Sequence, residues 1–147
     1  MSHPDHPATV SCFRDAVGLA LQLSEDYAYA QVAVLLDDDG TGLDRRVFDG
    51  VGVGLMPVLA WCLSTAAGIG RPIDVLLLTA RSIEPGVVRE QDLAHYRRAE
   101  RTLTGANLGL LDWIETDGEL VRSFAYLIHP DTAWIADPAD HRRVDRD

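Results

Sequence analysis

The sequence predicts a single α/β domain, built as a three-layer sandwich around a mixed β-sheet. A continuous apolar run at residues 74–79 (DVLLLT) is typical of a central strand that is covered on both faces. Asp117 and Gly118 lie between two β-rich runs and predict a hairpin turn. Segments with helical periodicity alternate with these strands. The predicted order is therefore helix, hairpin, helix, strand, helix, hairpin.

The N-terminal third is expected to form the first helix and the first hairpin. Thr9 is a candidate N-cap, and the apolar residues that follow recur at spacings of three and four: Val10, Phe13, Val17, Ala20 and Leu21. Residues 31–36 (QVAVLL) predict a strand, and residues 45–49 (RRVFD) predict its returning partner. The acidic segment 37–42 is predicted to be a turn, because a calcium loop in the best register would need a glutamate where Phe48 stands.

Residues 57–67 predict the second helix, which starts at Pro57 and is apolar nearly all round. A helix of this kind is usually buried on most of its surface. Cys62 falls in this helix and Cys12 in the first one. Neither belongs to a CxxC or Cys/His cluster, so both are predicted to be small buried apolar side chains rather than metal ligands or disulfide partners.

The C-terminal half contains the remaining elements. A loop over residues 82–89 follows the central strand and leads into a charged helix over 90–104 with one apolar stripe. Residues 107–116 and 119–128 are predicted to be the two strands of the last hairpin.

Length and composition agree with one globular domain over residues 9–140, with a flexible leader at 1–8 and a frayed tail at 141–147. The net charge of −10 disfavours binding to nucleic acid or to anionic membrane surfaces. No stretch is apolar enough for a signal core or a membrane span, so a cytoplasmic protein is predicted. All 13 positive residues are arginine, a usage that suggests a GC-rich, bacterial coding genome.

The stretch 74–123 resembles the core of the RadC-like JAB/MPN metalloprotease-fold family. In that family a buried strand ends in His-x-His-Pro-Ser-Gly. A proline-containing loop then leads to Ser-x-x-Asp at a helix start, and a strand with an apolar-Asp-His pattern precedes a hairpin. The corresponding pieces here are VLLL at 75–78, Pro85 with Gly86, REQD at 89–92, LLDWI at 110–114 and Arg122 with Ser123. The resemblance implies a JAB/MPN-like, cytidine-deaminase-like fold.

The zinc ligands of that family are replaced. Counting back thirteen residues from Asp92 places the two histidine positions at Thr79 and Arg81, and the serine of Ser-x-x-Asp falls at Arg89. Zinc needs three protein ligands with free lone pairs, which a guanidinium cannot offer. No metal, no cofactor and no catalytic residue is therefore predicted. Thr79, Arg81, Arg89 and Asp92 are expected to line a degenerate cleft.

Three functions stay open. The preferred one is a non-catalytic JAB/MPN-like domain that acts through a protein partner, through self-association or through a small ligand. The alternative is a hydrolase-type enzyme with a rebuilt, zinc-independent site around Arg81, Arg89, Asp92 and His95. The third is an unrelated small α/β binding module. For the cleft itself, Arg81 and Arg89 could bind a small anion, or Arg81 could pair with Asp92 or Glu84 and fill the vacated metal space.

Overall fold

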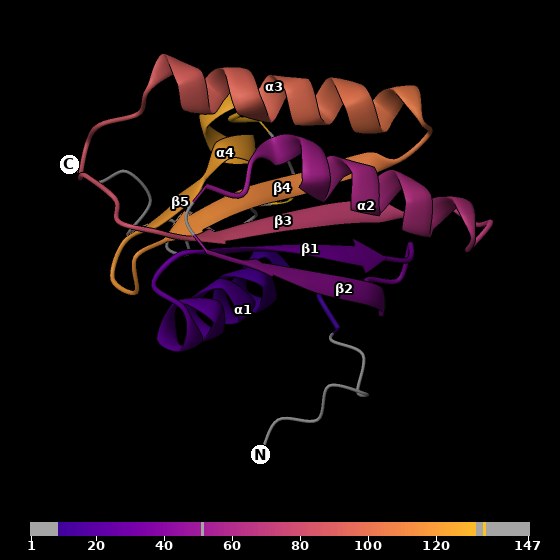
Figure 1. The fold of residues 1–147 in the computed structure, drawn as a ribbon, viewed down its shortest axis with the longest axis horizontal. Coiled ribbons are helices and arrows are strands. Elements are labelled where there is room, and N and C mark those ends of the chain that lie inside the picture. The colour runs from indigo at the N-terminus through magenta and orange to yellow at the C-terminus, as the bar shows by residue number, and fades with distance from the viewer. Residues whose placement is uncertain (1–8, 51, 132–133, 135–147) are drawn as a thin grey trace.

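The computed structural model describes residues 9–50, 52–131 and 134 (Figure 1). The leader predicted at 1–8 and the tail predicted at 141–147 lie outside the described residues. Within the described part of the chain, no helix is both long enough and apolar enough to cross a membrane.

A five-stranded open sheet forms the middle layer, with strand order β2-β1-β3-β4-β5. The parallel pair is β3–β4, and the other neighbouring pairs are antiparallel, so the sheet is mixed as predicted. The strands are β1 (Ala30–Leu36), β2 (Gly42–Asp49), β3 (Asp74–Ala80), β4 (Gly109–Thr116) and β5 (Val121–Ser123).

Helices cover both faces of this sheet, which confirms the α/β class (Figure 1). Helix α1 (Phe13–Asp26) packs on one face through Phe13, Ala16, Ala20 and Leu23. Helices α2 (Leu55–Ala67) and α3 (Glu90–Gly105) pack on the other face. The short helix α4 (Phe124–Ile128) follows β5 and contacts β4 and α3.

The last hairpin departs from the sequence prediction. Its turn forms at Gly118, whose φ of 101° suits glycine. The predicted second strand over 119–128 is wrong, however, because β5 ends at Ser123 and residues 124–128 form α4. The Ser123 hydroxyl accepts a hydrogen bond from the Tyr126 N–H, and Asp112 accepts one from the Ala125 N–H. These side-chain acceptors satisfy the first turn of a helix, so the apolar run FAYLI coils instead of extending.

The start of the first helix also differs from the prediction. Thr9 does not cap it, because Thr9 pairs with Thr41 in an isolated β-bridge and the helix begins at Phe13. Cys12 therefore precedes the helix and is exposed, so its predicted burial is wrong. The burial predicted for Cys62 is confirmed.

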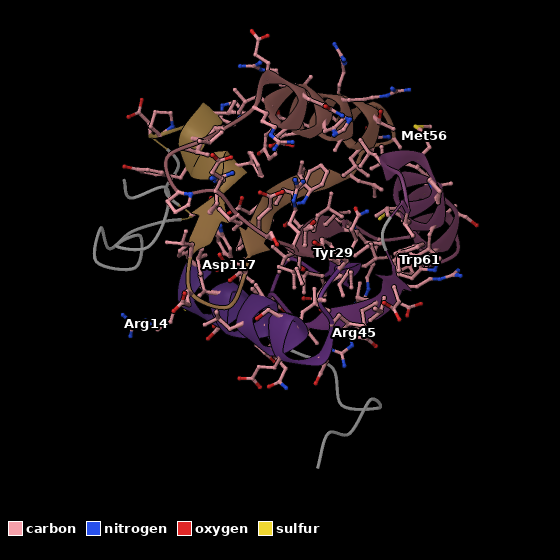
Figure 2. The ribbon with its side chains drawn as sticks, turned by 60° about the vertical axis from the view of Figure 1, so that its left-hand side comes forward. Arg14, Tyr29, Arg45, Met56, Trp61 and Asp117 are labelled. Carbon is pink, nitrogen blue, oxygen red and sulfur yellow. The ribbon has the colours of Figure 1, made fainter. Side chains whose placement is uncertain are left out.

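Helix α2 is buried along one face only, which contradicts the prediction that most of its surface is covered. Val58, Leu59, Cys62 and Ala66 face the core, whereas the Met56 side chain is 52% exposed and projects from the margin of the molecule (Figure 2). The prediction fails because the sheet and α3 cover a single side of the helix. An uncharged helix surface is left exposed as a result.

The segment 37–42 is a turn, as predicted. The Asp37 carboxylate accepts hydrogen bonds from the N–H groups of Asp39 and Thr41, both at 2.9 Å. An aspartate side chain that bonds to the following backbone is a common way to build such a turn.

Candidate functional site

A row of polar side chains crosses the sheet near the carboxyl ends of β3 and β4. Gln31 on β1 lies opposite Thr79 on β3, which lies opposite Glu115 on β4, which lies opposite Arg122 on β5. Residues that face each other across neighbouring strands share one face of the sheet. Since Leu77 and Trp113 belong to the core under α2 and α3, the row lies on that face. Open α/β sheets commonly place ligand sites outside the carboxyl ends of parallel strands.

Thr79 and Gln31 are held by the elements around them. The Trp113 indole N–H donates to the Thr79 hydroxyl at 2.8 Å. The Gln31 amide donates to the carbonyl of Val53, just before α2, at 2.8 Å. Hydrogen bonds to neighbouring parts of the protein therefore fix the positions of both side chains.

Glu115 lies between two guanidinium groups. Its Oε2 is 3.4 Å from Arg81 Nη1, and its Oε1 is 3.6 Å from Arg122 Nη1. The same Arg81 nitrogen lies 3.9 Å from Asp92 Oδ1, at the start of α3. Arg81, Asp92, Glu115 and Arg122 together form what we call the arginine–carboxylate cluster.

The cluster reaches solvent through Arg81. The Arg81 side chain is 38% exposed, whereas those of Glu115 and Arg122 are 5% and 4% exposed. Burial raises the pKa of Glu115 above its ordinary value. The nearby Asp92 acts in the same direction, and the two guanidinium groups oppose it. The effect of burial on the pKa of Glu115 is thus larger than the opposing effect of the two arginines.

Arg122 ties the loop between β3 and α3 to β5. Its Nη2 donates to the carbonyl of Glu84 at 3.2 Å, while its Nε is buried without a hydrogen-bond partner among the described residues. Glu84 therefore contributes its backbone to Arg122, and not its carboxylate to Arg81.

The predicted cleft residues come together only in part. Arg81 lies beside Asp92, which is one of the two partners predicted for it from the sequence. Thr79 precedes Arg81 by two residues, at the end of β3. Arg89 is exposed at the N-cap of α3, and among the described residues its side chain makes no hydrogen bond or ion pair with the cluster. Glu115 and Arg122 were not predicted. The register of the hairpin around Asp117 and Gly118, which places them opposite each other, is the signal that could have identified them.

The donors present do not suit the zinc ion that the resemblance implies. The Thr79 hydroxyl is engaged by an indole, Arg81 has no lone pair to donate, and Asp92 is paired with Arg81. A zinc site needs three lone-pair donors directed at one point. Three such donors are not present at these positions.

A second buried carboxylate, Asp112, lies on the same strand but on the opposite face. It accepts hydrogen bonds from the Ser123 hydroxyl at 2.7 Å, the Trp134 indole at 2.8 Å and the Ala125 N–H at 3.0 Å. The Trp113 N–H donates to it as well. Burial raises the pKa of Asp112 to about 6 against the opposing effect of these bonds. Asp112 thus joins β4, α4 and Trp134, and no cation contacts it in the described structure.

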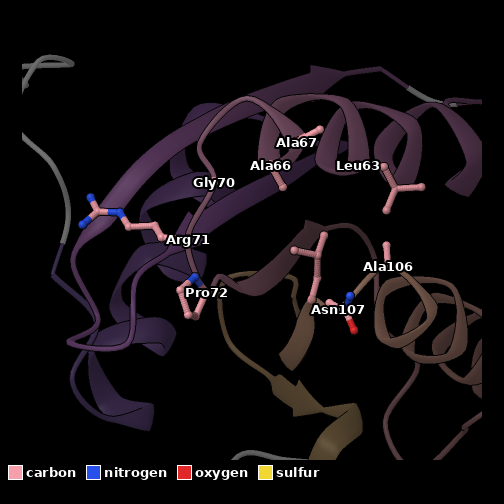
Figure 3. A pocket seen from close by; sticks show the side chains of 9 residues that line it. Leu63, Ala66, Ala67, Gly70, Arg71, Pro72, Ala106 and Asn107 are labelled. Carbon is pink, nitrogen blue, oxygen red and sulfur yellow. The ribbon is translucent and has the colours of Figure 1, made fainter.

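A groove of about 560 Å³ lies at the other end of α2 and α3 (Figure 3). Leu63, Ala66 and Ala67 line it from α2, and Ala106, Asn107 and Leu108 line it from the segment after α3. None of the cluster residues borders this groove. Its lining is mostly apolar and offers no convergent set of reactive groups.

Comparison with known proteins gives no further evidence for a function: no protein-family model, no curated protein and no solved structure matches the chain.

Proposed function

We propose that this chain is a non-catalytic RadC-like JAB/MPN domain that acts through protein contacts. One observation carries the proposal: Arg81, at the position where the resemblance expects a zinc ligand, engages both Asp92 and Glu115. The order of strand, loop, helix, strand and hairpin over residues 74–123 supports the JAB/MPN assignment.

The balance of charges favours protein contact over the binding of a small anion. Two arginines in the cluster face two carboxylates, so the cluster carries no surplus positive charge for an incoming anion. By contrast, α2 and β2 expose apolar side chains, among them Met56, Val47 and the nearby Tyr29. These exposed apolar side chains give a protein partner positions to contact without a charged ligand.

The proposal can be tested by rebuilding the family's ligand set. We expect the wild-type chain to bind no zinc in native mass spectrometry after purification without chelator. The double variant Thr79→His/Arg81→His supplies two imidazoles near Asp92 and is expected to bind one zinc per chain. The matched control adds Asp92→Ala to the double variant and is expected to lose that zinc, because a ligand is missing.

Two results would contradict the proposal. Stoichiometric zinc on the wild-type chain would show that its metal ligands lie elsewhere, and peptide hydrolysis by it would show that the protein is an enzyme. A folded double variant that binds no zinc would argue against the JAB/MPN assignment. Turnover of a substrate that Arg81→Ala abolishes without unfolding would favour the rebuilt, zinc-independent site instead.

A further inference from the structure

Strand β2 forms one margin of the sheet and has a free outer edge. Among the residues that the structure describes, β2 pairs with β1 alone, and Thr9 meets only Thr41, just ahead of the strand. Its middle residues are exposed, including Val47 at 38%. An exposed edge of unpaired N–H and C=O groups is a template for pairing with another strand.

The backbone phase of β2 determines which residues present these groups. The Gly50 N–H donates to the Tyr29 carbonyl at 3.0 Å, one step beyond the pair Ala30 and Asp49. In an antiparallel ladder, residues alternate between those directed at the partner strand and those directed away from it. The Gly50 N–H points at β1, so the even-numbered residues of β2 direct their backbone N–H and C=O groups at β1. The odd-numbered residues direct theirs at the free edge, and we call Arg45, Val47 and Asp49 the outward residues.

The outward residues are complementary in charge to a second copy of themselves. If two β2 strands pair antiparallel about a two-fold axis at Val47, Arg45 of each copy lies opposite Asp49 of the other. An axis at Arg45 or at Arg46 would instead place an arginine opposite itself. Val47 is therefore the register in which opposite charges meet and like charges separate.

The other face of β2 also fits this register. Arg46 already lies 5.1 Å from the ring centre of Phe48 within one copy, and Phe48 packs edge-to-face on Trp61 of α2 at 6.4 Å. Pairing about Val47 places Arg46 of one copy opposite Phe48 of the other, so cation–π contacts can form across the axis. In Figure 2, Arg45 of β2 and Trp61 of α2 are labelled toward the lower right of the view.

We infer that two copies of this chain form a symmetric dimer by pairing their β2 strands antiparallel about Val47. Arginines on an edge ordinarily discourage such pairing, but here each outward arginine has an aspartate opposite. The charged residues of β2 are Asp44, Arg45, Arg46 and Asp49, which sum to zero in a chain with a net charge of −10. The strand itself therefore adds no net charge repulsion between two copies. The inference rests on the contact role proposed above and names its partner as a second copy.

The test is the mass of the full chain in solution, measured by sedimentation equilibrium across micromolar concentrations. We expect a species of twice the 16.1 kDa chain mass. Arg45→Asp and Asp49→Arg should each weaken the dimer about tenfold, because each puts like charges opposite one another. The double swap Arg45→Asp/Asp49→Arg should restore the affinity to within about threefold, since the pairs re-form with reversed polarity.

Val47→Pro tests the backbone pairing by itself. Its N–H is directed outward, so proline removes a bond to the second copy and none to β1. We expect a monomer with an unchanged circular dichroism spectrum. Arg46→Pro, on an inward residue, is the matched control and should destabilise the fold itself.

A monomer at every concentration, or a dimer that the charge variants leave unchanged, would overturn this inference. Neither result would affect the zinc measurement that tests the proposed function. The proposed role in protein contacts would then require a partner other than a second copy. Conversely, zinc or hydrolysis in the wild-type chain would overturn the proposed function whatever the mass.

Discussion

Asp112 and Glu115 are two buried carboxylates on one strand, and the protein accommodates them in different ways. They are three residues apart, so they point to opposite faces of the sheet. Asp112 is surrounded by neutral hydrogen-bond donors from Ser123, Ala125, Trp113 and Trp134. Glu115 is placed between the guanidinium groups of Arg81 and Arg122.

The difference shows what each carboxylate does for the fold. Asp112 organises backbone and side chains where β5 ends, so it specifies where α4 begins. Glu115 balances charges that come from β3 and β5, so it holds together the end of the sheet where the family resemblance expects a metal. Hydrogen bonds suit the first role because they are directional, and charges suit the second because they act between distant segments.

Removing Asp112 should have the largest effect. Asp112→Ala leaves the Ala125 N–H and the Trp134 indole N–H without their acceptor in a buried place, at a cost of about 4 kcal/mol in unfolding free energy. Urea unfolding followed by tryptophan fluorescence measures this. Asp112→Asn, which keeps one acceptor oxygen, is the control and should lose about half as much. A loss below about 1 kcal/mol for alanine would mean that these bonds do not organise α4.

Removing Arg122 should cost somewhat less. Arg122→Met leaves Glu115 buried beside the half-exposed Arg81 alone, which should lower the unfolding free energy by about 3 kcal/mol. Arg81→Met, at the exposed end of the cluster, should cost under about 1 kcal/mol. Adding Glu115→Gln to Arg122→Met removes the stranded charge and should recover part of the loss. Equal costs for the two arginines would contradict the asymmetry in burial.

The pH dependence should give the smallest effect. Burial raises the pKa of Asp112 from 3.8 to about 6, so the folded state binds a proton that the unfolded chain releases at a lower pH. Stability from this group is fully present below pH 3.8 and is lost as the pH rises to about 6. The raised pKa of Glu115 acts in the same direction.

The measurement compares wild type with Asp112→Asn by urea unfolding at two pH values. The advantage of the wild type should shrink by about 2 kcal/mol between about pH 4.5 and pH 7, at about 1.4 kcal/mol per pH unit. Parallel profiles for the two proteins would show that Asp112 keeps the same protonation state in the folded and unfolded chains.

The local sequence pattern predicted most helices and strands correctly, but it was wrong about the residues of α4 and about the burial of α2. Strand β1 and helix α3 lie within a residue or so of their predicted bounds, because a short apolar run with β-branched valines and a regular apolar stripe each favour one structure. The run FAYLI has strand propensity, but Asp112 and Ser123 supply acceptors that favour a helix there. Likewise, the apolar character of α2 predicted burial without showing that only the sheet and α3 would cover it.

Some residues of the candidate site could likewise be predicted from the local sequence, and others could not. Arg81 and Asp92 could be identified from a motif with fixed spacing, since both lie in one contiguous segment. For Glu115 and Arg122 the hairpin register indicates only that they face each other, and it does not predict their burial, because a charged residue next to a turn is ordinarily solvated. Their burial depends on the loop that Arg122 binds through the Glu84 carbonyl.

By itself, the sequence determined the α/β class, the central strand and the hairpin at Gly118. These follow from residue types and periodicity, which act over a few neighbouring positions. Tertiary structure decided the arginine–carboxylate cluster, the hydrogen bonds around Asp112 and the free edge of β2. Each of these depends on which strands become neighbours and in what register, and a register is set by packing across segments that are distant in the chain.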